Sequence, residues 1–217
     1  MQLPAYMTQL AEHASDEMTL EYMAKWAPPD EGGRASAVLM LIADGEHGPD
    51  VLLIERAAAL RNHAGQPAFP GGGTDPGDAD PAGTALREAS EEVDLDPSGV
   101  SVVATLPPLF LEPSGYVVTP VLAYWHEPAP VRVLDAAEVA SVARIPIAEL
   151  AEPTNRFCVA HPSGYTGAAF GIRGSVVWGF TAGLLAMLLE LGGWAQPWDE
   201  TDVRDLETAI GGQEGFA

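Results

Sequence analysis

The stretch GGGTDPGDADPAGTALREASEEVDL, residues 71–95, decides the fold because it joins a glycine-rich turn to a helix. Asp80 and Pro81 predict the helix start, since aspartate accepts free backbone N–H groups and proline suits the first turn. Small and apolar residues then recur on one helical face, at Ala85, Leu86, Ala89 and Val93. We expect this face to pack against a sheet.

Three carboxylates lie within five residues of the predicted helix, at Glu88, Glu91 and Glu92. Like charges at this spacing repel one another, and a bound divalent cation would cancel the repulsion. Mg²⁺ and Mn²⁺ require oxygen ligands, which three glutamates converging from one helix would supply. Arg87 lies four residues before Glu91, so we expect the two to pair. A solvated acidic helix face is the alternative interpretation of the cluster.

With the upstream glycines at their spacing, the segment resembles the Nudix box, G-x5-E-x7-R-E-U-x-E-E-x-G-U, in which U is apolar. Gly72 takes the place of the first glycine and Asp78 that of the first acid, and the later positions match at Arg87, Glu88, Ala89, Glu91, Glu92 and Leu95. Three departures occur. The first acid is Asp, eight residues rather than seven precede Arg87, and Asp94 replaces the late glycine. Aspartate can occupy the left-handed position at a helix end, although less easily than glycine.

The resemblance implies a pyrophosphohydrolase that depends on Mg²⁺ or Mn²⁺ and cleaves compounds in which a group is linked to a nucleoside diphosphate. It implies that Glu88, Glu91 and Glu92 hold the cation and that a carbonyl of Gly71 adds a ligand. Arg87 would orient the glutamates rather than contact the substrate. The implied fold is α/β, a Nudix-type α/β/α sandwich with a mixed sheet between helices.

A second motif precedes the box and contains Arg56, Arg61 and His63, three potential cations within eight residues. Arginine forks suit phosphate oxygens. The motif is informative because the chain has only ten Lys and Arg against 31 Asp and Glu. The alternative is a polar loop whose arginines pair with nearby acids.

This stretch resembles the signature of the coenzyme A pyrophosphatase branch of Nudix hydrolases, L-L-T-x-R-S-x-x-L-R-x-H-x-G-Q-V-x-F-P-G-G. The matching residues are Arg56, Leu60, Arg61, His63, Gly65, Gln66, Phe69, Pro70, Gly71 and Gly72. The resemblance implies that the substrate is bound by Arg56, Arg61, His63, Gln66 and Gly72. It implies hydrolysis of the diphosphate bond in coenzyme A or acyl-CoA, giving 3′,5′-ADP and (acyl-)phosphopantetheine.

The same signature has departures in this chain. Ala57 replaces Ser, Pro67 replaces an apolar residue, and Glu55 adds an anion beside the first arginine. Because Pro67 lacks a backbone N–H, any strand there must lie at an edge or face outward. The departures favour a rival reading, in which a Nudix hydrolase acts on ADP-ribose, a dinucleotide polyphosphate or a nucleoside triphosphate. A further alternative is a non-catalytic nucleotide-binding module, which the loss of a box glutamate would indicate, and none is lost.

The general base has several contenders. Glu138 lies in the stretch LDAAEV, residues 134–139, which resembles a family loop ending in Glu-Val, and it is expected to act as a metal ligand or as the base. Glu88 and Glu92 are equal contenders for the base, and a solvated loop acid is the other interpretation of Glu138. His63 is either an acid or phosphate contact or an ordinary loop histidine.

Composition restricts the partners. The net charge of -21 argues against a basic nucleic-acid-binding face and repels anions at long range, so a phosphate substrate needs local arginines or metal. No apolar stretch reaches the ~20 residues of a membrane span, and the first residues lack a secretory pattern. We expect a cytoplasmic protein with a small-molecule, CoA-like nucleotide partner, no nucleic acid and no membrane, and a homodimer is one arrangement open to it. The lone Cys158 excludes an intramolecular disulfide.

The chain of 217 residues suits one domain with extensions. We expect a helical N-terminal extension over residues 1–30, a Nudix hydrolase domain over 31–194 and an acidic C-terminal tail over 195–217. Strands are expected at residues 35–42, 51–54, 100–106 and 117–125, the first two as a hairpin, and a buried helix is expected at residues 178–191.

Overall fold

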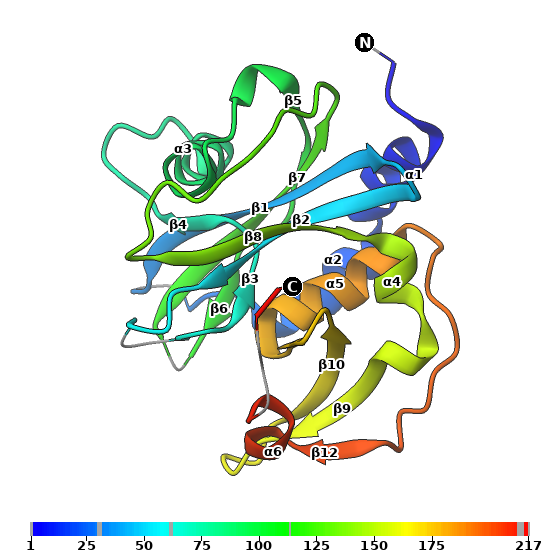
Figure 1. Ribbon diagram of the computed structural model, residues 1–217. Coiled ribbons are helices and arrows are strands. Elements are labelled where there is room, and N and C mark those ends of the chain that lie inside the picture. Colours follow the sequence, from blue (N-terminus) through cyan, green and yellow to red (C-terminus); the bar gives the residue numbers. More distant parts are fainter. Residues whose placement is uncertain (1, 30–31, 61–62, 113, 212–214, 217) are drawn as a thin grey trace. The chain divides into compact units, whose positions relative to one another are not determined.

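The computed structural model describes residues 2–29, 32–60, 63–112, 114–211 and 215–216. The chain forms two compact units, one made of residues 1–44 and 69–134 and the other of residues 45–68 and 135–217. Runs of strands are separated by helices along the chain (Figure 1), which confirms the expected mixed α/β fold.

The first unit is built on a mixed sheet. Its strands are β1 (Arg34–Gly45), β4 (Gly71–Gly73), β5 (Val100–Thr105), β6 (Leu109–Leu111) and β7 (Tyr116–Trp125). Strand β1 runs parallel to β7 and antiparallel to β4, while β5 and β6 run antiparallel to β7. Residues 120–125 are all buried. Since successive residues point to opposite faces, the sheet is covered on both faces at this strand.

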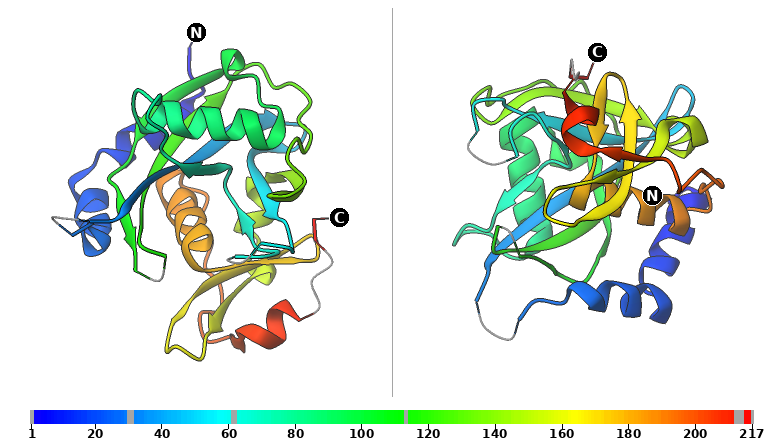
Figure 2. Two further views of the ribbon diagram at one scale, coloured as in Figure 1. Left: turned by 90° about the vertical axis from the view of Figure 1, so that its left-hand side faces the viewer. Right: turned by 90° about the horizontal axis from the view of Figure 1, so that it is seen from below.

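Helix α3 (Pro81–Val93) contacts β4, β5 and β7 within this unit (Figure 2). The Asp80 side chain caps its start by accepting a hydrogen bond from Gly83 N at 2.8 Å, as its sequence predicts. Ala85, Ala89 and Val93 are fully buried. The helix ends at Asp94, which adopts the left-handed conformation with φ of 59°. This aspartate therefore occupies the left-handed position after the helix, where glycine is usually found.

The N-terminal residues form helices α1 (Ala5–Ala14) and α2 (Glu17–Met23), followed by the short turn η1 (Ala24–Trp26); another short turn, η2 (Pro97–Gly99), precedes β5. Met7 and Leu10 are fully buried. The hydroxyl of Tyr6 donates to Asp44 Oδ1 at 2.6 Å, and that of Tyr124 donates to Asp44 Oδ2 at 2.8 Å. The expected extension is therefore packed into the first unit by apolar burial and by a shared carboxylate.

The second unit contains two sheets. In one, β2 (Gly48–Arg56) lies antiparallel to β3 (Pro67–Ala68) and to β8 (Val139–Pro146). The other has the order β11-β10-β9-β12 and comprises β9 (Arg156–Ala160), β10 (Thr166–Ile172), β11 (Ser175–Val177) and β12 (Val203–Asp205). The helices of the unit are α4 (Ile147–Ala151), η3 (Pro153–Asn155), α5 (Gly179–Leu191) and α6 (Leu206–Ile210). Strand β3 is only two residues long and comes first in its sheet order, so Pro67 lies where its missing N–H is tolerated.

In the described part of residues 195–217, which we expected to form an acidic tail, the chain forms β12 and α6. Strand β12 pairs in parallel with β9, and Leu206 of α6 is only 2% exposed (Figure 1, orange to red). Apolar packing explains why this segment folds onto the sheet, because Leu206 joins a buried cluster with Phe157, Val159 and Ala169. In the described part of the chain, no helix is both long and apolar enough to cross a membrane.

Candidate functional site

Arg87 is the hub of a network of carboxylates in the first unit. Its Nε lies 2.9 Å from Asp78 Oδ1, and its Nη1 lies 2.9 Å from Glu91 Oε2. Nη2 lies 3.0 Å from Glu88 Oε1 and donates to the carbonyl of Gly73 at 2.9 Å. One planar guanidinium thus holds the helix glutamates and ties them to the glycine strand.

Asp78 is the innermost partner of this arginine, with a side chain only 6% exposed. Its hydrogen bond from Arg87 lowers the pKa of its carboxyl well below the usual range, assisted by bonds from the Asp75 N–H and the Thr84 hydroxyl. The same hydrogen bond raises the pKa of Arg87. The pair is therefore ionised throughout the neutral range, and Asp78 fixes the direction of the guanidinium.

Glu88 and Glu92 face the glycine strand β4. Gly71 N donates to Glu92 Oε2 at 3.0 Å, and Glu92 is only 3% exposed. A Cβ on Gly72 would lie 2.5 Å from the carboxyl carbon of Glu88, so only glycine leaves room for that carboxylate. Gly71 has φ of +154°, and a Cβ there would overlap the carbonyl of Ala37. Both glycines are thus required by close approach.

Glu91 differs from the other two glutamates, because its side chain is 61% exposed and is held by Arg87. Among the residues that the structure describes, no three His, Cys, Asp or Glu side chains form a group that could hold a metal ion. That Glu88, Glu91 and Glu92 together hold a cation stays a prediction. Like charges repel, and the adjacent guanidinium offers Glu91 a partner at 2.9 Å.

The donor set nevertheless fits a hard divalent cation. Glu88 and Glu92 are carboxylates one helical turn apart. Glu88 lies close to Gly72, and Glu92 accepts a hydrogen bond from Gly71 N. Hard cations prefer such oxygen ligands. The N–H of Gly71, rather than its carbonyl, is the group that contacts Glu92.

The predicted substrate residues of the second unit lie in one loop. Arg56 N donates to the carbonyl of Gln66 and Gly65 N donates to that of Arg56, both at 3.0 Å. His63 Nδ1 lies 2.8 Å from Gln66 Oε1, and His63 has a left-handed φ of 57°. Within the described residues, no hydrogen bond or ion pair is seen at the Arg56 guanidinium. Arg61 lies outside the described residues.

Glu138 belongs to the same unit and is exposed. Its carbonyl accepts a hydrogen bond from Ala57 N at 2.8 Å, while Asp135 stabilises the turn before it. The structure therefore brings Glu138 beside the residue that follows Arg56. The structure also gives a role to two acids outside the predicted set. Asp78 anchors Arg87, and Glu55 accepts hydrogen bonds from Ser141 Oγ at 3.0 Å and from Phe216 N at 3.1 Å. The match of Asp78 to the first acid of the box was the available signal for one of them.

Residues 33–161 match the NUDIX domain family. The chain is 36% identical over 120 residues to a Photorhabdus laumondii protein named Uncharacterized Nudix hydrolase NudL, a stretch that covers 55% of this chain and 62% of that protein. It is 53% identical over 60 residues to the protein of the same name from Yersinia pestis, covering 28% and 29% of the two chains. The chain thus matches about three fifths of the length of the Photorhabdus protein and about three tenths of the length of the Yersinia protein.

Solved structures of the same kind resemble the chain at lower identity. A NUDIX hydrolase from Alicyclobacillus acidocaldarius is 20% identical, with a TM-score of 0.47 over 75% of this chain and 93% of that one. RenU, a Nudix hydrolase from M. Smegmatis, is 25% identical, with a TM-score of 0.46 over 56% and 76% of the two chains.

Proposed function

The chain belongs to the NUDIX domain family, and we propose that it hydrolyses the diphosphate bond of coenzyme A or an acyl-CoA with Mg²⁺ or Mn²⁺ as cofactor. The products would be 3′,5′-ADP and (acyl-)phosphopantetheine. The observation that carries the hydrolase proposal is the placement of Glu88 and Glu92 against Gly71 and Gly72, with Arg87 held between carboxylates.

Glu88 and Glu92 would hold the cation, because each carboxylate is fixed by one rigid helix and meets the glycine backbone. Glu91 would complete the ligand set by exchanging its contact with Arg87 for the cation. A bound divalent cation would neutralise the charge that develops on the diphosphate and activate water for attack on phosphorus. Arg87 would stay with Asp78 and preserve the geometry of the glutamates.

Recognition of the substrate phosphates is assigned to the loop that begins at Arg56. In a chain of net charge -21, long-range attraction of an anion is absent, so local cations must supply it. We propose that Arg56 and Arg61 contact phosphate oxygens and that His63, Gln66 and the backbone of Gly72 position them. The coenzyme A branch is favoured by the match of this loop to that signature, in order and in spacing.

The water-activating base is proposed to be a carboxylate, either Glu138 or one of the helix glutamates, Glu88 and Glu92. Glu138 is exposed and follows a turn ordered by Asp135, so its side chain is accessible to solvent. Replacement of Glu138 by Gln separates the choices. A base lost at this position lowers kcat and removes one limb of its pH profile, whereas a solvated acid leaves both unchanged.

The experiment that tests the proposal is product identification. The protein is incubated with coenzyme A and Mn²⁺, and the nucleotides are separated. Release of 3′,5′-ADP, suppressed by chelator, is expected. Cleavage of ADP-ribose or a dinucleotide polyphosphate with coenzyme A left intact would overturn the substrate and retain the hydrolase.

A different nucleoside diphosphate derivative is the second candidate. It is favoured by the departures of this loop from the coenzyme A signature at Glu55, Ala57 and Pro67. The same panel of substrates decides between the two.

A further inference from the structure

Glu55 lies near the end of β2, directly before the arginine that begins the proposed phosphate-binding loop. One oxygen of its carboxylate, Oε2, accepts hydrogen bonds from the Ser141 hydroxyl at 3.0 Å and from Phe216 N at 3.1 Å. Gly215 approaches the same oxygen so closely that a Cβ there would lie 2.6 Å from it. Two separate parts of the second unit, Ser141 of β8 and the segment Gly215–Phe216, therefore meet at one carboxylate oxygen of Glu55.

The segment Gly215–Phe216 is adapted to this contact. Gly215 has φ of +83°, a conformation that residues with a side chain rarely adopt, and Phe216 is half-buried. Phe216 is 161 residues from Glu55 in the sequence, so chain connectivity does not impose the contact. Ordering such a segment costs conformational entropy, and hydrogen bonds to an ionised carboxylate are strong enough to offset part of it.

The anchor also bears on the loop that follows. Glu55 pairs with Pro67 of β3, and the next residue, Arg56, donates its N–H to the Gln66 carbonyl. Pro67 offers no N–H to the edge of this short strand. The segment Gly215–Phe216 is thus attached where the loop bearing Arg56, His63 and Gln66 begins and ends.

We infer that Glu55 is a positioning residue that holds the segment Gly215–Phe216 at the base of the phosphate-binding loop, where the segment restricts entry of the substrate diphosphate. The inference rests on the proposed function in taking this loop as the phosphate site. It also explains why an anion is accommodated beside Arg56, since two hydrogen bonds disperse its charge.

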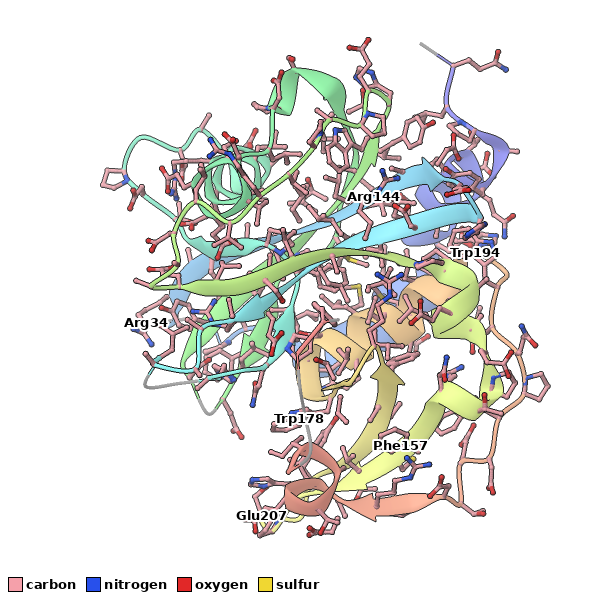
Figure 3. The ribbon with its side chains drawn as sticks, in the orientation of Figure 1. Arg34, Arg144, Phe157, Trp178, Trp194 and Glu207 are labelled. Atoms are coloured by element: carbon pink, nitrogen blue, oxygen red, sulfur yellow. The ribbon has the colours of Figure 1, made fainter. Side chains whose placement is uncertain are left out.

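The test compares Glu55→Ala, which removes both anchor and anion, with Gly215→Val, which keeps the anion but excludes the segment by overlap and by its positive φ. Each variant should lower the KM for coenzyme A about 3- to 10-fold, the equivalent of one lost hydrogen bond, with kcat unchanged. The double variant should match either single one. Glu207→Gln, at an exposed position in α6 (Figure 3), is the control and should leave KM unchanged.

A lower KM in Glu55→Ala alone would show that the anion, not the segment, repels substrate, and would overturn the inference. Unchanged or raised KM in both variants would overturn it as well. If coenzyme A is not a substrate, the proposed function fails, but the inference about Glu55 is still tested. The dissociation constant of inorganic pyrophosphate is then compared among the same variants in place of KM. Hydrogen exchange at the Phe216 amide tests the anchor without any substrate, because exchange should accelerate in Glu55→Ala, and equal rates in both proteins would refute the contact.

Discussion

Replacement of Gly72 by Ala should damage the site while sparing the fold. The new methyl group would lie 2.5 to 2.7 Å from the carboxyl atoms of Glu88, against at least 3.4 Å for an ordinary contact. Glu88 must then move by about 1 Å, and a displacement of that size at a catalytic group costs roughly 100-fold in rate. We therefore expect kcat/KM on the best diphosphate substrate to fall about 100-fold.

The free energy of unfolding should change much less. Overpacking costs about 1–3 kcal/mol in a rigid core, and the flexible glutamate places this site at the low end. The loss of glycine entropy in the unfolded chain returns about 0.4–1 kcal/mol. Urea unfolding should therefore show a net loss of less than about 1 kcal/mol.

Gly73→Ala is the matched control, because it lies on the same strand and a Cβ there meets nothing within 4 Å. It should keep the activity of the parent protein and raise its free energy of unfolding by the same entropy term, about 0.4–1 kcal/mol. Equal activity of Gly72→Ala and the parent would refute the inference that the Glu88 carboxylate acts from its place against Gly72. Equal losses of activity in both alanine variants would indicate that β4 tolerates no side chain at either position, whatever the place of Glu88.

Three further perturbations test the surrounding network. Arg87→Lys should weaken Mn²⁺ binding about 10- to 100-fold in a calorimetric titration, because a point charge cannot bridge several carboxylates, and unchanged affinity would contradict the hub role. Asp94→Gly should raise the free energy of unfolding in urea by about 0.5 kcal/mol. Glycine removes the cost of the left-handed conformation, and this gain exceeds the energy of the lost ion pair with Arg132, which is exposed. Asp94→Val should lower the free energy of unfolding. The pKa of Asp78 is lower in the folded state than the ordinary 3.8, so its contribution to stability is present above pH 3.8 and lost as the pH falls further. Between neutral and acid pH, the free energy of unfolding should therefore fall less in Asp78→Asn than in the parent. Parallel plots of this free energy against pH would exclude the contribution of Asp78.

Much of the helix and its network followed from local rules. The start at Asp80, the left-handed Asp94 and the pair of Arg87 with Glu91 are each set by residues a few positions apart, so spacing predicts them. The family match over residues 33–161 agrees with the box and its spacing.

Other features depend on tertiary contacts that spacing does not report. Asp78 lies nine residues before Arg87, and its match to the first acid of the box marked the residue without showing that the guanidinium is its partner. The contact between Glu55 and Phe216 joins residues far apart in the sequence. Strand β12 is three exposed residues long and has no alternating apolar pattern, so its pairing with β9 left no signal.

The most direct test of the central claim, that carboxylates of the box hold a catalytic cation, is the turnover of Glu92→Gln on the best-cleaved diphosphate substrate. Glutamine keeps the shape of the side chain and can still accept the hydrogen bond from Gly71 N, so the fold should persist. It removes the negative charge that binds a hard cation. Turnover should fall by several orders of magnitude in a protein whose circular dichroism matches that of the parent. Turnover equal to that of the parent would contradict cation binding by these carboxylates.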